Sequence, residues 1–106
     1  MNAVTSWAFA FALTQLLEIP VYRLGGWRIG TAFGASAITH PILTLAIDFE
    51  LIDATRMTAL VAAEVVVALV EGVWLRMRER QPLPFAWSFA ANGFSFCAGL
   101  ALFGPP

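Results

Sequence analysis

Four ionisable side chains and one amide interrupt long apolar stretches of the sequence, and these are the residues that could do chemistry. They are Glu18, His40, Glu64, Glu71 and Asn92. Ionisable groups within such stretches are costly and usually face the interior of a helix bundle. Carboxylates and an imidazole can bind a divalent cation, carry a proton, or activate water in a hydrolase. These five residues are the predicted buried polar or ion site.

Residue counting places these side chains in two layers. Glu18 and Glu71 each lie five residues from an arginine at the end of their stretch, so both are roughly 8 Å inside. Asn92 is expected at a similar depth, whereas His40 and Glu64 lie at about 18 Å, near mid-membrane. Glu64 and Glu71 are seven residues apart, so they share one helix face. The counts predict one layer of Glu18, Glu71 and Asn92 and a deeper layer of His40 and Glu64.

Composition indicates what kind of protein holds these residues. Of the 106 residues, 59% are hydrophobic and only 12% are charged, with a mean hydropathy of +0.77. Soluble domains carry about a quarter charged residues, so this composition excludes an ordinary soluble globule and a disordered chain. The single cysteine excludes a disulfide scaffold, and no basic patch suggests a nucleic-acid partner. We therefore expect an integral membrane protein whose first partner is the lipid bilayer.

Four apolar stretches have the length of membrane-spanning helices. They cover residues 4–22, 29–47, 58–75 and 85–103, and about 20 helical residues cross a bilayer. The connections are short, which makes consecutive helices antiparallel neighbours. The expected fold is an all-α membrane protein with a single transmembrane domain, residues 1–106. Its four transmembrane helices should form an up-down antiparallel bundle.

The arginines predict the orientation of this bundle. Five of the six lie in the turn after the first stretch and the loop after the third, whereas the loop over residues 48–56 holds three acidic residues. Positively charged loops stay in the cytoplasm, so both termini should be outside, an N-out/C-out topology, in a bacterial inner membrane. Trp27, Trp74 and Trp87 lie near the cytoplasmic ends and are expected to form an interfacial aromatic belt.

Small residues at helical spacing predict close helix contacts. Serine and glycine recur at 4-3-4 spacing with Asn92 in the last stretch, and the second stretch contains a GxxxG pattern. The predicted helix-packing seam consists of Ser88, Ser95, Gly99, Gly30 and Gly34. A four-helix chain is small for a transporter, so a homo-oligomer is expected.

Three functions fit these features. The favoured hypothesis is a homo-oligomer that handles a cation or proton within the bilayer, in which His40, Glu64 and Glu71 could ligate a divalent metal ion. The second is a non-catalytic accessory or assembly subunit of a larger membrane complex. The third is a small intramembrane hydrolase that uses glutamate and histidine. With one histidine and no metalloprotease motif, enzyme activity is the less favoured interpretation.

Overall fold

The computed structural model describes residues 3–49 and 56–104, which form four α-helices. These are α1 (Ala3–Leu24), α2 (Ile29–Asp48), α3 (Met57–Arg78) and α4 (Pro84–Phe103). The all-helical, four-helix part of the prediction is confirmed, and each helix begins and ends within three residues of its predicted stretch. Two of the acidic residues that were used to predict the orientation, Glu50 and Asp53, lie outside the described residues.

Local sequence explains where the helices begin and end. The turn after α1 contains Gly26 at φ 101°, a left-handed conformation that glycine adopts without steric penalty. Pro84 starts α4 at a position where a missing N–H costs nothing. Gly104 ends α4 at φ 81°, and its N–H donates to the carbonyl of Leu100 at 2.8 Å. The helix boundaries are therefore set by residues next to them in the chain.

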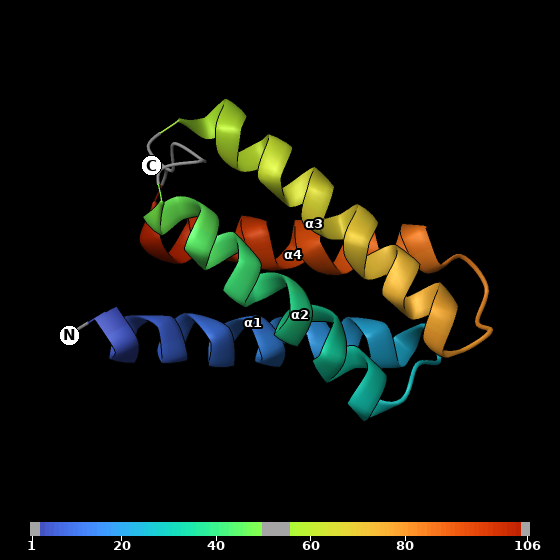
Figure 1. Cartoon of the computed structure of the whole chain (residues 1–106). Coiled ribbons are helices and arrows are strands. Elements are labelled where there is room, and N and C mark those ends of the chain that lie inside the picture. Colours follow the sequence, from blue (N-terminus) through green and yellow to red (C-terminus); the bar gives the residue numbers. More distant parts are fainter. Residues whose placement is uncertain (1–2, 50–55, 105–106) are drawn as a thin grey trace.

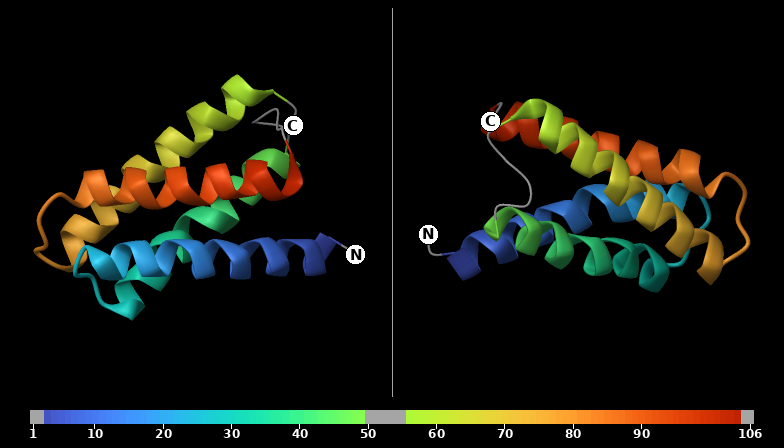
Figure 2. Two further views of the ribbon diagram at one scale, coloured as in Figure 1. Left: turned by 180° about the vertical axis from the view of Figure 1, so that it is seen from behind. Right: turned by 45° about the horizontal axis from the view of Figure 1, so that its top comes forward.

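The helices form an up-down bundle in which both short turns lie at one end and both termini at the other (Figure 1). Both α1 and α3 contact α2 and α4. Among the described residues, no backbone contact joins α1 to α3 or α2 to α4. The helices splay apart toward the end that holds the termini, as the two views in Figure 2 also show.

Three of the helices are long and apolar enough to cross a membrane, over Ile29–Ala46, Met57–Arg78 and Pro84–Leu102. The outer surface is apolar, as in membrane-spanning bundles, and Leu16 and Ile42 are 72% and 62% exposed. The first helix, α1, is not one of the three. A topology of four spans therefore stays a prediction.

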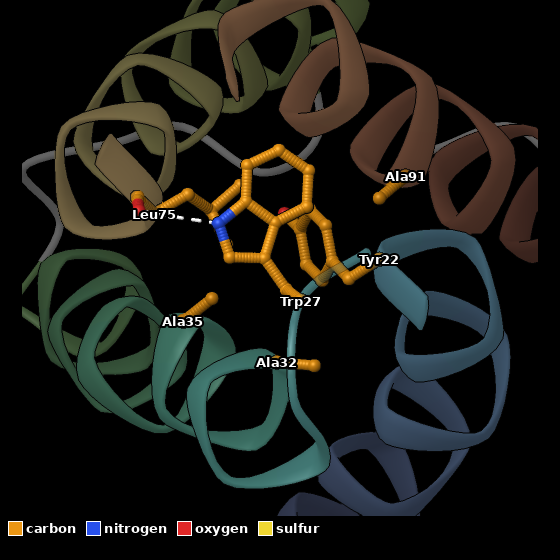
Figure 3. Packing of buried hydrophobic residues seen from close by; sticks show 6 residues of the cluster. All are labelled: Tyr22, Trp27, Ala32, Ala35, Leu75 and Ala91. Atoms are coloured by element: carbon orange, nitrogen blue, oxygen red, sulfur yellow. Dashed lines mark hydrogen bonds between the residues drawn. The ribbon is translucent and has the colours of Figure 1, made fainter. Parts of the chain in front are cut away.

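An aromatic plug, which we define as Tyr22 and Trp27, closes the bundle at the end of the short turns. Both side chains are fully buried, and their rings lie 6.5 Å apart, edge to face. Figure 3 shows the Trp27 indole among the four helices, where its Nε1 donates to the carbonyl of Leu75 at 3.2 Å. The expectation that Trp27 belongs to an interfacial belt is wrong, because a side chain with no exposed surface cannot anchor at the lipid headgroups.

Two glycines let aromatic rings pack directly on a helix backbone. A Cβ at Gly72 would lie 2.4 Å from Cδ1 of Phe85, and a Cβ at Gly34 would lie 2.7 Å from Cζ2 of Trp74. Both distances are far below van der Waals contact, so neither site has room for a side chain. Gly72 thus brings α3 and α4 together, and Gly34 does the same for α2 and α3.

The other residues of the predicted seam behave differently from one another. Ser88 is buried, and its hydroxyl donates to the carbonyl of Ala68 at 2.6 Å, which joins α4 to α3. An added Cβ at Gly30 or Gly99 would meet no atom within 4 Å. Of the predicted seam, Gly34 and Ser88 therefore make close helix contacts, whereas Gly30 and Gly99 make none with the described residues.

Glu79 links the two short turns. Its carboxylate accepts a hydrogen bond from the backbone N–H of Arg28 at 3.0 Å, and Nε of Arg28 lies 3.7 Å away. A hydrogen bond from Thr31, followed by the one from the Arg28 N–H, holds the pKa of Glu79 below its usual value of 4.5. Glu79 thereby satisfies a backbone donor at the start of α2.

The packing of Gly72 predicts a matched pair of glycine variants. Gly72→Ala should lower the free energy of unfolding by about 1–3 kcal/mol, because the new methyl group overlaps the Phe85 ring. Gly93→Ala in α4 meets no atom within 4 Å and should be neutral or stabilising, since alanine favours a helix by about 1 kcal/mol. Denaturant unfolding of the detergent-solubilised chain measures both. Equal effects would show that Phe85 does not pack on Gly72.

The contacts of Glu79 predict a pH dependence of stability. Because its folded pKa is depressed, Glu79 stabilises the fold above about pH 4.5, and this contribution is lost as the pH falls through the lowered value. Glu79→Gln should therefore melt at a lower temperature than the wild type near pH 7, and the gap should close toward about pH 3. Thermal unfolding in detergent at both pH values measures this. A gap of the same size at both would contradict it.

Candidate functional site

Glu71 is hydrogen-bonded to all three of the other helices. It belongs to α3 and is 1% exposed. Its Oε1 accepts hydrogen bonds from the Tyr22 hydroxyl of α1 at 2.5 Å and the Asn92 amide of α4 at 3.3 Å. Its Oε2 accepts one from the Thr39 hydroxyl of α2 at 2.7 Å. These donors fix the carboxyl group and offset part of the cost of burying it.

Glu18 lies beside Glu71 and is less well satisfied. It is 2% exposed, and its Oε2 accepts a hydrogen bond from the Ser95 hydroxyl at 2.7 Å. Ser95 and Asn92, which donate to Glu18 and Glu71, lie three residues apart on α4 and so bring the two carboxyl groups close together. No hydroxyl, amide or backbone donor among the described residues reaches the buried Oε1 of Glu18. We refer to Glu18 and Glu71 as the carboxyl pair.

A partly open central cavity of about 350 Å³ lies between the four helices and reaches the carboxyl pair. Its polar lining includes Thr39, Asn92 and Ser95. Apolar side chains from all four helices form much of the wall, namely Phe9, Leu13, Leu17, Leu43, Leu60, Val67, Phe96 and Leu100. Many of these lie toward the splayed end of the bundle, whereas the aromatic plug closes the opposite end. The carboxyl pair therefore lies between the plug and the open part of the cavity.

The lining of the central cavity contains two buried carboxyls and very little positive charge. No arginine is among the lining residues, the chain has no lysine, and His40 is the one basic group in the wall. Two adjacent carboxylates repel each other strongly where water is excluded. A buried charge also needs a partner to offset its desolvation. The carboxyl pair therefore requires a proton or a cation.

The deeper predicted layer, His40 and Glu64, lines the same cavity. Both side chains are half-buried, and the imidazole packs against Phe11 with ring centres 5.5 Å apart. Glu64 and Asn92 also line a groove of about 180 Å³ between α3 and α4. The structure thus places Glu18, Glu71 and Asn92 together in one cluster, with His40 and Glu64 in the wall of the cavity beside it.

The described residues do not favour a metal centre. No group of three or more His, Cys, Asp or Glu side chains within the described ranges could hold a metal ion. The predicted set His40, Glu64 and Glu71 shares the cavity wall, but the oxygens of Glu71 already accept three hydrogen bonds. We therefore do not propose a metal at this site.

Sequence reasoning missed several residues that complete the site. Tyr22 follows Glu18 by four residues and Gln15 precedes it by three, so this helical spacing was a usable signal. The Gln15 amide donates to the Ser36 hydroxyl, which joins α1 to α2. Thr39 gave no comparable signal, because a hydroxyl within a membrane helix commonly bonds to its own backbone, as Thr39 also does to Ala35 at 3.2 Å.

Comparisons with family models, curated proteins and solved structures find no match to this chain. Any function must therefore be inferred from the chain's own residues and their geometry.

The bonds to Glu71 predict the effect of removing one donor. Tyr22→Phe should lower the free energy of unfolding by about 1–3 kcal/mol, because it deletes a buried hydroxyl while keeping the ring that packs on Trp27. In a Glu71→Leu background the same change should cost nothing, because the hydroxyl has already lost its acceptor. Denaturant unfolding of the wild type, the two single variants and the double variant measures the interaction energy between Tyr22 and Glu71. The same loss in both backgrounds would show that Tyr22 does not act through Glu71.

Proposed function

We propose that this chain is a small polytopic membrane protein that moves a proton or another cation through its interior as a homo-oligomer. The observation that carries the proposal is the carboxyl pair, two adjacent buried carboxyls in a cavity with no arginine or lysine. A proton or cation supplies the missing positive charge. Intramembrane ionisable groups commonly mark ion pathways and proton relays.

The proposal includes the topology that brings this cavity across a bilayer. All four helices cross, the arginine-rich turns face the bacterial cytoplasm, and the termini are outside. Support comes from the shared length of the helices, 20–22 residues, and from the five arginines at the end of the short turns. The central cavity then widens toward the outside, and the aromatic plug faces the cytoplasm.

In this arrangement a cation enters from the splayed end and passes His40 and Glu64 before it reaches the carboxyl pair. Its onward path is blocked by Trp27, whose indole is held by one hydrogen bond to the Leu75 carbonyl. Release to the cytoplasm therefore requires the plug to move. Transport would alternate between a state with the plug closed, as here, and one with the plug open.

A homo-oligomer is supported by the outer surface of α2 and α3. An apolar groove of about 500 Å³ runs between them, and three alanines of α3, Ala59, Ala62 and Ala63, line it. Small residues allow close approach of another helix. The accessory-subunit alternative would instead require a different membrane protein on this surface, so a stable homo-oligomer purified without partners would count against it.

The hydrolase alternative has one observation in its favour. Glu64 and Glu71 both line the central cavity, which is large enough to hold water. Such an enzyme would also need a donor for the reaction's oxyanion, and the Asn92 amide, which could serve as one, already donates to Glu71 at 3.3 Å and to the Ser88 carbonyl at 2.9 Å. Cation handling uses the observed geometry without breaking these bonds. It is therefore the function that we prefer.

Flux through liposomes tests the proposal. Wild-type chain should dissipate an imposed proton or cation gradient, and Glu18→Gln or Glu71→Gln should slow this at least about tenfold by removing a charge from the pair. Glu79→Gln is the matched control, because it makes the same chemical change outside the cavity and should leave the flux unchanged. A pH-sensitive or cation-sensitive dye inside the vesicles reports the rate. Wild-type flux in folded Glu18→Gln and Glu71→Gln would refute the proposal.

A further inference from the structure

We infer that the cation bound at the carboxyl pair is an organic ammonium ion, a primary amine on a compact apolar body. This inference rests on the proposed function, because it takes the carboxyl pair to be a cation site. It adds the chemical class of the cargo, which comes from three features of the central cavity.

The first feature is the pattern of unused acceptors. Both oxygens of Glu71 already accept hydrogen bonds, whereas Oε1 of Glu18 is buried and accepts none from the described residues. Glu18 is 2% exposed and lines the cavity. An ammonium group brings three N–H donors and no acceptor, so it can satisfy this oxygen and offset one of the two negative charges of the pair at the same time.

The second feature is the size and chemistry of the space beside the carboxyl pair. About 350 Å³ equals the share of roughly ten water molecules, far more than a bare ion occupies. Hard metal ions such as Ca²⁺ need about six to eight oxygen ligands around them, whereas the carboxyl oxygens here are those of the pair at one end and those of Glu64 farther along the wall. Most of the remaining wall is apolar and includes Leu13, Leu17 and Phe96. A polar end and an apolar wall match a ligand with an ammonium head and an apolar body.

The third feature is a groove on the outer surface that shares lining residues with the central cavity. Glu64, Asn92 and Phe96 line both the central cavity and the groove between α3 and α4. That groove lies on the apolar outside of the bundle, where Val61, Val65 and Phe89 are 41–44% exposed. Glu64, Asn92 and Phe96 therefore form the wall between this groove and the central cavity, and an amphipathic amine in a bilayer, or the amine headgroup of a lipid, would reach the carboxyl pair from the membrane where these side chains move apart.

Equilibrium binding to the full chain in phosphatidylcholine nanodiscs tests this inference. We expect 2-phenylethylammonium to bind by isothermal titration calorimetry, after subtraction of its partition into empty nanodiscs. The neutral analogue 2-phenylethanol and the anion 3-phenylpropanoate should bind at least about tenfold more weakly, because neither carries an ammonium group. Equal binding of 2-phenylethanol would overturn the inference, since apolar contact alone would then account for affinity.

Two variants and a lipid substitution locate the site and the source of the amine. Glu18→Gln should weaken binding of 2-phenylethylammonium at least about tenfold, and Glu79→Gln should leave it unchanged. In nanodiscs that contain phosphatidylethanolamine, weaker apparent affinity for the probe would assign a lipid amine as the natural ligand, and unchanged affinity would assign a free amine. If folded Glu18→Gln bound 2-phenylethylammonium as tightly as the wild type, the carboxyl pair would not be the binding site.

Failure of this inference is distinguishable from failure of the proposed function. Carboxyl-dependent proton or sodium flux in a chain that binds no 2-phenylethylammonium would refute the amine and leave cation transport standing. Binding of the amine that requires Glu18, in a chain without any flux, would refute transport and leave the amine site standing.

Discussion

Burial of the Glu71 carboxyl is the constraint on which the rest of this structure depends. One side chain of α3 accepts hydrogen bonds from Tyr22, Thr39 and Asn92, one residue from each other helix. Burying a carboxyl group here costs desolvation free energy unless its hydrogen-bond donors are present. Each helix must therefore be rotated about its axis so that its donor faces Glu71. Because apolar surface toward lipid gives no driving force for association, these polar bonds and close backbone contacts select the bundle.

The two ends of the bundle have different roles as a consequence. At the end of the short turns, Tyr22 both donates to Glu71 and packs against Trp27, so the polar cluster and the aromatic plug share one residue. At the other end the helices splay, and the central cavity opens beside Glu18. A closed end, an open end and a charged group between them are the parts that an alternating pathway needs. The incomplete hydrogen bonding of Glu18 leaves a buried acceptor in the wall of the central cavity.

Much of the fold could be predicted from the sequence because helix formation in an apolar environment is a local property. Apolar length, the glycine turn before Trp27 and Pro84 at the start of α4 define the four helices without reference to their neighbours. The residue counts also grouped Glu18, Glu71 and Asn92, because the rise per residue is constant along a helix, and in the structure all three line one cavity. Orientation and the crossing of α1 are still predictions from charge and length.

Only the tertiary structure decided which residues face one another. A membrane helix is apolar on nearly all sides, so its pattern of residues does not reveal which face is buried. Trp27 therefore looked like an interfacial anchor although it is fully buried, and Thr39 looked like an unremarkable hydroxyl although it holds Glu71. The sequence by itself determined the helices, their order and the position of each polar group along its helix. The rotation of each helix about its axis, and with it the carboxyl pair, followed from contacts between residues distant in the chain.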